Sequence, residues 1–500
     1  MDRTFFTPRQ NLSVGICIAF LAANRAASDF EYNERQKKHK LPRGLSCIWP
    51  LAAQKLNTIN ELNMSHNSKN NLISRSAIRR YLWLAGSLGA VATVMSEGFR
   101  NPTIGTSDLG ESGGRIADVG DPTAVQQNPA NLVNVTNIST ELTPSVIYIS
   151  SDFHSSLGPQ SASSTEPWKV LPNAFLSVPL DNDRFAVGFG LTSPFGLGNE
   201  WDTTSPAFAP RTGVLRYETP YSSELETVNL NPTLAVRLLD NLSLGVGLDA
   251  MWSSITLEQY YPSFLLGGGG DSNLKADGDG WGWGGNVGLT WDITDRQRLA
   301  VTYRSPMRVD YGGTFSINNL PAAAAAVGAT PTSSFSSTVN FPTMVSAGYG
   351  IDITDKIHLE SDFEWLEFSR FKSLDINAGN DAVLFRLLDA SPDTPEDWHN
   401  TFTAGIGGDW QFAEHWDLRA GYQYFESPVP NSTFSPTIPD ANQNVATIGI
   451  AWHNKHNSLE ASYGLDFYND RHITNDQIKA FDGTYSFNVH LLSFAYTYSF

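Results

Sequence analysis

The chain has 500 residues with 33 Lys+Arg against 51 Asp+Glu, and residues 1–96 contain 13 of the basic and 5 of the acidic side chains. The rest of the chain therefore holds 20 basic and 46 acidic residues, a net charge of −26. So acidic a body argues against nucleic acid as a partner, because phosphate neutralisation requires Lys and Arg. Cys17 and Cys47 are the only cysteines, which excludes disulfides and cysteine metal sites beyond them.

A short apolar segment at residues 81–94 has the composition of the core of a secretory signal peptide. Ser96 follows it as a small residue at a plausible cleavage point, and the basic residues before it are Arg75, Arg79 and Arg80. The apolar run is too short for a stable transmembrane helix. We therefore expect residues 64–96 to be a signal peptide; a buried core helix is the alternative.

A signal peptide normally begins a polypeptide, whereas this one begins near residue 70. We expect translation to start at Met64, with residues 1–63 as a non-native or unstructured extension, because that segment has no coherent pattern. A second hypothesis treats residues 12–28 as the signal and the residues after them as a linker.

Residues 97–139 are rich in Gly, Asp, Asn and Pro and have little periodicity. They precede the first predicted strand. A barrel of about 14 strands has an interior wider than its own side chains can fill. This segment is therefore predicted to fold into the lumen as a plug; the alternative is a disordered periplasmic tail.

Residues 140–500 alternate between two kinds of side chain. In the last segment, Leu492, Phe494, Tyr496, Tyr498 and Phe500 share one face, and small or polar residues occupy the other. Period 2 predicts a two-faced strand. Clear alternation covers 185–191, 228–237, 242–249, 281–291, 299–311, 357–365, 416–424, 459–467 and 492–500, and weaker alternation covers 143–152, 172–180, 338–353, 400–412 and 443–454. We predict an all-β fold, a transmembrane antiparallel β-barrel of about 14 strands with lipid outside.

The connections between these strands are of two kinds. Tight polar turns are predicted at 181–183, 240–241, 294–295, 354–355, 414–415 and 454–456, and long loops at 193–222, 260–279, 316–337, 377–398, 426–441 and 470–483. Short turns inside and long loops outside are typical of outer-membrane barrels. The charged residues Asp249, Arg304, Arg308 and Glu360 all fall on the non-aromatic parity, with the apolar parity unbroken from Leu299 to Tyr311, which predicts that they face the lumen.

The third predicted strand contains an irregularity. Alternation runs from Phe185 to Leu191 and then meets Ser193-Pro194-Phe195-Gly196. Proline removes a donor from the strand ladder, so this sequence would bend the strand and could open the wall. Alternatively, the strand simply ends at Thr192.

The segment from about residue 97 to Phe500 resembles the FadL family of outer-membrane transporters of hydrophobic compounds, which includes a toluene-transporter (TodX-like) branch. The matching sequences, in chain order, are Glu97-Gly98-Phe99, Gly113-Gly114, Ala117-Asp118, Asn128-Pro129-Ala130, Thr192-Ser193-Pro194-Phe195-Gly196, Thr302-Tyr303-Arg304-Ser305, Ser427-Pro428-Val429-Pro430 and Ile438-Pro439-Asp440. Each is weak alone, but their order over about 400 residues and the predicted strand number make the resemblance fairly specific.

The resemblance implies passive uptake of a hydrophobic molecule. Long loops capture it, a pocket beside the N-terminus of the plug receives it, and movement of the plug releases it sideways at the kinked third strand. The implied transport residues are Phe99, Asn128, Pro129, Ala130, Ser193, Pro194, Phe195, Gly196, Gln259, Tyr260, Tyr261, Phe264 and Arg386. The implied partners are fatty acids or hydrocarbons, outer-membrane lipid and the barrel assembly machinery, in the outer membrane of a Gram-negative bacterium; no cofactor is implied.

The ligand class stays open because Gln259 and Leu387 stand where fatty-acid-transporting relatives place basic residues. A carboxylate buried without a cation is costly, which weakens a fatty acid as the ligand, although Arg386 could still serve. The apolar loop segments at 260–266 and 322–326 suit hydrophobic capture or local packing.

A general porin for polar solutes is the alternative function, and the predicted plug argues against it. An enzyme is not expected, because the ten histidines are scattered, mostly at turns and strand ends, and form no paired constellation, so no metal ligands are predicted. A soluble all-β protein is disfavoured by the signal peptide and the aromatic parity.

Overall fold

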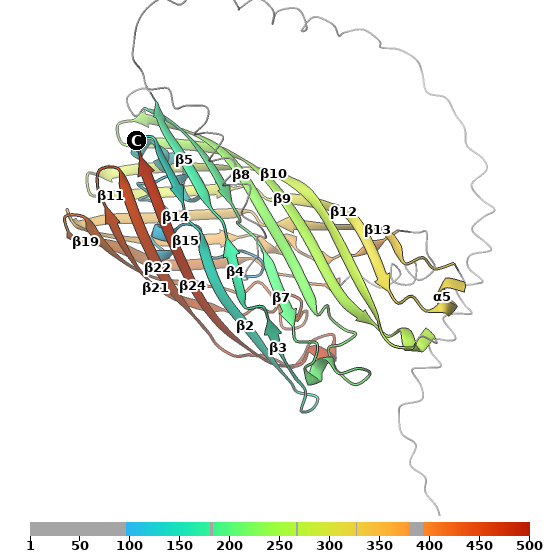
Figure 1. Ribbon diagram of the computed structural model, residues 1–500. Helices are drawn as coiled ribbons and strands as arrows, with labels where there is room; N and C mark the ends of the chain where they lie inside the picture. Colours follow the sequence, from blue (N-terminus) through green and yellow to red (C-terminus); the bar gives the residue numbers. More distant parts are fainter. Residues whose placement is uncertain (1–96, 181–183, 267–268, 327, 380–393) are drawn as a thin grey trace, which may run out of the picture. The chain divides into compact units, whose positions relative to one another are not determined.

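The computed structural model describes residues 97–500 apart from 181–183, 267–268, 327 and 380–393. The signal peptide and the extension predicted before residue 97 lie outside the described residues. Alternating sequences form one closed antiparallel barrel of 14 wall strands (Figure 1), as predicted. Some wall strands are interrupted and comprise two or three shorter segments.

The interrupted wall strands carry several labels each. Wall strand 1 is β1 (Ser139–Leu142) with β2 (Ser145–Ser155), strand 2 is β3 (Ser161–Thr165), β4 (Trp168–Leu171) and β5 (Ala174–Leu180), strand 3 is β6 (Phe185–Thr192) with β7 (Leu197–Trp201), strand 7 is β11 (Gln297–Arg304) with β12 (Met307–Asn318), strand 8 is β13 (Thr332–Phe341) with β14 (Met344–Thr354), and strand 13 is β22 (Asn457–Tyr468) with β23 (Arg471–Ile473).

The other wall strands are β8 (Ser222–Leu239), β9 (Leu242–Tyr261), β10 (Ser272–Thr294), β15 (Ile357–Leu366), β19 (Thr401–Ala413), β20 (Trp416–Phe425), β21 (Gln443–His453) and β24 (Gly483–Ser499). Adjacent strands pair antiparallel in chain order. The last strand then closes the ring on the first, with Ser139 opposite Ser499 and Ser145 opposite Ser493. Closure pairs the first strand with the last, so the sheet has no terminal edge exposed to lipid.

Short elements decorate the loops: η3 (Pro206–Phe208), η4 (Ser263–Leu266), α5 (Ala322–Ala326), η5 (Phe368–Arg370), β16 (Ser373–Leu374), β17 (Asn377–Ala378), β18 (Thr394–Pro395) and η6 (Lys479–Phe481). The barrel thus has a short-turn end, where the turns at 240–241, 355–356 and 414–415 lie, and a long-loop end. Several strands are longer than predicted. The loops between β9 and β10 and between β12 and β13 cover only 262–271 and 319–331, because the alternation of β10 and β12 continues past the segments recognised in the sequence.

The plug segment folds inside the barrel. It contains α3 (Thr106–Gly110), α4 (Ala124–Gln127) and η2 (Pro129–Asn134), with most of its residues buried. Among the helices of the described residues, none is long and apolar enough to cross a membrane. Hydrogen bonds and a buried apolar cluster hold the plug to the wall. In that cluster, plug residues that include Val125 and Leu132 pack with Phe175, Ala186 and Ala235 of the wall.

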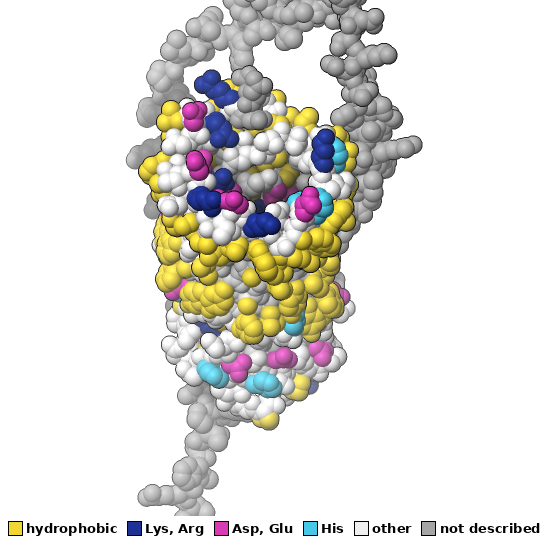
Figure 2. All heavy atoms as spheres, turned by 90° about the vertical axis from the view of Figure 1, so that its left-hand side faces the viewer, with side chains coloured by type: hydrophobic (Ala, Val, Ile, Leu, Met, Phe, Trp, Pro, Cys, Tyr) yellow, Lys and Arg dark blue, Asp and Glu magenta, His cyan; other side chains and the backbone are white. Residues whose placement is uncertain are grey.

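The outer face carries the aromatic parity, as predicted. Trp283 is 72% exposed, and the exposed side chains of the last strand include Phe494, Tyr496 and Tyr498. Figure 2 shows hydrophobic side chains as a broad belt on the visible face, with charged side chains gathered beyond both of its edges. Such a belt is the surface that hydrocarbon chains of a bilayer would cover.

One prediction of parity is wrong. Asp249, Arg304 and Glu360 are buried and face the lumen, whereas Arg308 is exposed and pairs with Asp310 on the outer face. The reason is a bulge at residues 305–306. Arg304 lies opposite Asn286 and Gly312 lies opposite Asp279, so eight steps on wall strand 7 match seven on β10. One extra residue reverses every later side chain, and Met307, Val309 and Tyr311 point inward.

Candidate functional site

The lumen is apolar toward the long-loop end. Inward-facing residues there belong to one buried cluster, which includes Met251, Ile255, Leu257, Met307, Val309, Tyr311, Phe315, Phe335, Val339 and Phe341. We call this set the apolar column. Toward the short-turn end many inward-facing residues are polar or charged, including Asp249, Asn286, Thr290, Arg304 and Glu360, and the apolar Phe175, Ala186 and Ala235 pack on the plug. The apolar interior is thus the part of the barrel nearest the long loops.

The N-terminal end of the plug meets the apolar column at Phe99. Its ring is buried and lies with centroids 5.1–6.1 Å from five other aromatic rings, namely Phe195, Phe341, Phe368, Phe371 and Trp398. The preceding Gly98 has φ 71°, and a Cβ there would lie 2.4 Å from Trp398. Only glycine therefore allows the backbone to deliver the Phe99 ring to this cluster.

The same plug segment pairs with the interruption of the third wall strand. The Asn101 amide donates to the Pro194 carbonyl at 3.0 Å, and the Gly196 amide donates to the Phe99 carbonyl at 2.7 Å. The Asn101 side chain also donates to the Ser193 carbonyl at 2.8 Å. The plug thus satisfies part of the backbone freed by the kink, and the wall side chains of Asn173 and Thr227 bond the amides of Ser193 and Phe195.

The predicted kink is present. Thr192 lies opposite Asn229 and Leu197 lies opposite Leu225, so residues 193–196 stand against only three residues of β8. On the other side, the ladder ends at the pair Ala174–Leu191 and resumes at Thr165–Glu200. Eight residues on each strand therefore face one another without a ladder pair, which weakens the wall at this place. The strand neither runs straight nor ends at Thr192.

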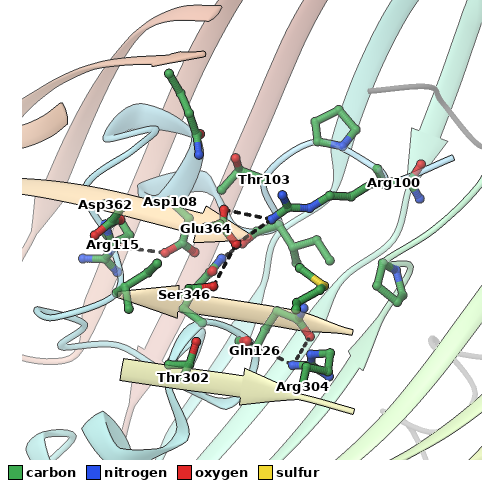
Figure 3. A pocket seen from close by; sticks show the side chains of 18 of the residues that line it. Arg100, Thr103, Asp108, Arg115, Gln126, Thr302, Arg304, Ser346, Asp362 and Glu364 are labelled. Atoms are coloured by element: carbon green, nitrogen blue, oxygen red, sulfur yellow. Dashed lines mark hydrogen bonds and ion pairs between the residues drawn. The ribbon is translucent and has the colours of Figure 1, made fainter. Parts of the chain in front are cut away.

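Below Phe99, toward the short-turn end, lies a small polar cavity of about 80 Å³ between the plug and the wall. Its lining includes Arg100, Asp108, Arg115, Pro194, Arg304 and Glu364 (Figure 3). The Arg100 guanidinium donates to both oxygens of Glu364 at 3.0 Å and to Glu97 at 3.1 Å. Arg304 pairs with Asp249 and donates to the Gln126 carbonyl at 3.1 Å.

Three alternate carboxylates of β15 hold the plug. Glu364 binds Arg100, Asp362 accepts from the Arg115 amide at 2.7 Å, and Glu360 accepts from the amides of residues 116–118 at 2.5–2.8 Å. Period 2 places these side chains on one lumen-facing row. The charged row that the sequence assigned to the lumen therefore anchors the plug.

Burial changes the acidity of the plug carboxyls. Desolvation raises the pKa of Glu97 from 4.5 to about 7, although the charge of Arg100 and a hydrogen bond from Thr401 oppose the shift. Desolvation likewise raises the pKa of Asp108 to about 6, against the charge of Arg115. The buried carboxyls of Glu97 and Asp108 thus bind a proton more tightly than solvated carboxyls would.

The predicted Asn128-Pro129-Ala130 sequence lies at the plug–wall contact. The Asn128 amide nitrogen donates to the Ile116 carbonyl at 2.8 Å and to Thr290 at 2.9 Å, and its oxygen caps η2. A Cβ on Gly245 would lie 2.2 Å from the Pro129 carbonyl carbon, so a wall glycine admits the plug backbone. These residues position the plug and are not members of the Phe99 cluster.

The predicted loop residues lie at the long-loop end of β9. Gln259 donates to the Tyr217 carbonyl at 2.8 Å, and the Tyr260 ring lies 3.8 Å below the Arg216 guanidinium. Tyr261 packs against the buried cluster that contains the apolar column. The Phe264 ring lies 6.3 Å from that of Tyr217. Arg386 lies outside the described residues.

The sequence analysis did not identify most of the Phe99 cluster. Phe341, Phe368, Phe371 and Trp398 come from strand ends and loops, where no periodicity marks a buried side chain. The structure brings together Phe99 and Phe195 from the predicted set, and it places the Asn128 sequence and the Gln259 loop elsewhere.

Comparison with known proteins agrees with this architecture. The family model described as Outer membrane protein transport protein (OMPP1/FadL/TodX) matches residues 88–500. The Long-chain fatty acid transport protein of Escherichia coli strain K12 is 27% identical over 466 residues, covering 84% of this chain and 96% of the relative. The Putative outer membrane protein NMB0088 of Neisseria meningitidis is 25% identical over 434 residues, covering 79% and 91%.

Among solved structures, a Pseudomonas aeruginosa FadL homologue superposes with a TM-score of 0.69 at 22% identity, covering 81% of this chain and 100% of that one. The Pseudomonas putida toluene transporter TodX gives 0.64 at 18% identity, with the same coverage. These likenesses show a shared fold. Because the family model matches most of the length of this chain, the chain belongs to the OMPP1/FadL/TodX family of outer-membrane transport proteins.

Proposed function

We propose that this protein passively takes up hydrophobic molecules, long-chain fatty acids or related hydrocarbons, across the outer membrane. The observation that carries the proposal is the apolar column, which meets the interrupted wall strand at Phe99. A porin for polar solutes requires a polar path along the axis, whereas an apolar interior at the long-loop end favours molecules that leave water readily.

The proposed path has three steps. The long loops around Tyr260 and Phe264 capture the molecule, which then displaces side chains of the apolar column toward Phe99. Movement of residues 97–101 breaks their hydrogen bonds to residues 193–196 and opens the wall. The molecule leaves sideways there, because the charged plug below offers no apolar route along the axis.

Neutral hydrocarbons suit the described residues better than fatty acids. Arg216, beside the loop aromatics, is bound to Asp271 at 2.7 Å, and Arg100 is bound to Glu364 and Glu97. At either of these two arginines a carboxylate ligand would have to replace the partner, at the cost of leaving a buried carboxylate unpaired. A neutral ligand imposes no such cost.

An uptake assay tests the proposal. A strain lacking this protein and a complemented strain receive long-chain fatty acid, an aromatic hydrocarbon or a small polar sugar, each separately. Faster uptake of a hydrophobic compound, with unchanged sugar uptake, supports the proposal. Restored uptake of the sugar alone would favour the porin.

The lateral exit has its own test. Deletion of Pro194 leaves three residues opposite three on β8, which restores both a regular register and the missing donor. We expect this variant to assemble but to lose uptake. Pro179→Ala, which removes a proline from a regular ladder in β5, serves as the matched control and should keep uptake. Normal uptake after the deletion would contradict lateral release.

A further inference from the structure

A histidine surrounded by carboxylates joins the plug to the wall near the short-turn end. Nδ1 of His358, on β15, lies 2.8 Å from Oδ1 of Asp352 on β14 and 3.7 Å from Oδ2 of Asp118 in the plug. Its other ring nitrogen, Nε2, is buried without a hydrogen-bond partner and faces Glu360 at 3.6 Å. Two consecutive wall strands and a distant plug segment thus converge on one imidazole.

The charge of this cluster is unbalanced. Asp118, Asp292, Asp352 and Glu360 contribute four negative charges, and Arg298, which pairs with Asp118 and Asp292, contributes one positive charge. The formal sum is −3 when His358 is neutral. A neutral imidazole has one N–H, so one of its nitrogens would direct a lone pair at a carboxylate. A divalent cation at Nδ1 reduces the formal sum to −1 and leaves the Nε2–H to face Glu360.

We propose that Asp118, Asp352 and His358 bind a divalent transition-metal ion, with Zn²⁺ as the representative, and that this ion ties the plug to the wall. The three ligand atoms lie within 4.8 Å of one another. Ligands of a tetrahedral Zn²⁺ with bonds of about 2.1 Å are about 3.4 Å apart, between the two distances measured at Nδ1.

The surroundings match those of a metal ligand. With the ion on Nδ1, the proton of His358 sits on Nε2 and points at Glu360, the carboxylate–histidine–metal arrangement that orients a ligating ring. The His358 side chain is 11% exposed, whereas Asp118 and Asp352 are 28% and 36% exposed, so water can reach the site as a fourth ligand. One imidazole and two carboxylates favour Zn²⁺ over Ca²⁺, which takes oxygen ligands. Binding here is independent of what the barrel transports.

Metal binding tests the site directly. The full-length protein in detergent is stripped with chelator and titrated with Zn²⁺ by calorimetry, with bound metal counted after equilibrium dialysis. We expect Zn²⁺ to bind with high affinity. His358→Asn and Asp352→Asn should each lower that affinity at least about 100-fold. His453→Asn is the matched control, because that histidine also contacts a carboxylate, Asp417, at 3.2 Å but lies outside the site. The Zn²⁺ affinity of His453→Asn should equal that of the wild-type protein.

Two further measurements keep the test decisive. Co²⁺ added to the stripped wild-type protein should give the visible spectrum of a site with one nitrogen and carboxylate oxygens, which requires no variant to fold. Zn²⁺ should also slow hydrogen exchange of the amides of residues 116–118 in the wild type but not in His358→Asn. A protein that binds no Zn²⁺, loses it equally in His453→Asn, or exchanges at an unchanged rate with metal bound would overturn the proposal.

Discussion

Replacing Phe99 with alanine tests whether this ring holds the plug against the kinked strand. Phe99 is buried and contacts five aromatic rings, and truncating a buried phenylalanine costs about 3–5 kcal/mol. If that energy serves docking of residues 97–101, the undocked fraction rises about 100- to 5,000-fold, at ~1.4 kcal/mol for each factor of ten. The barrel itself should remain folded, because no wall ladder pair involves Phe99.

Hydrogen exchange measures this docking. The amides of Asn101 and Gly196 bond across the contact between plug and kink, so both should exchange faster in Phe99→Ala. Phe434→Ala is the control: it removes an equally buried ring that packs on Tyr485 with centroids 4.5 Å apart and is not among the five rings around Phe99. Unchanged exchange at Asn101 and Gly196 in Phe99→Ala, or equal acceleration in the control, would refute the reasoning.

Two further predictions concern buried charge. Because burial raises the pKa of Glu97 from 4.5 to about 7, docking is fully favoured below pH 4.5 and weakens as pH rises through 7, by up to ~3 kcal/mol. Exchange at Asn101, corrected for intrinsic rate, should be slower at pH 5 than at pH 8, and Glu97→Gln should abolish the difference. Arg304→Met leaves Asp249 buried without its cation and should destabilise the barrel by about 3–5 kcal/mol in denaturant unfolding, whereas adding Asp249→Leu should recover most of that loss. Equal stability of the single and double variants would contradict this account of the pair.

The sequence predicted the features that depend on local periodicity. Alternation of side chains is a property of a few adjacent residues, so it identified the wall strands, the lipid-facing parity and the lumen row of Glu360 without knowledge of any partner. The interruption at Pro194 was visible for the same reason, since proline acts on its own strand. Strand ends were less accurate, because β10 and β12 extend past the segments that the pattern marks.

Only the tertiary structure decided which distant residues meet. The bulge at residues 305–306 reverses the facing of Arg308, and its effect depends on how β10 is paired rather than on composition. Phe99 contacts Trp398, and Asp118 lies beside His358, although hundreds of residues separate each pair in the sequence. No periodic pattern encodes such contacts. The alternating sequence of this chain therefore determines a barrel in a membrane. The three-dimensional pairing of plug and wall determines where that barrel is apolar and where the ladder of its wall is interrupted.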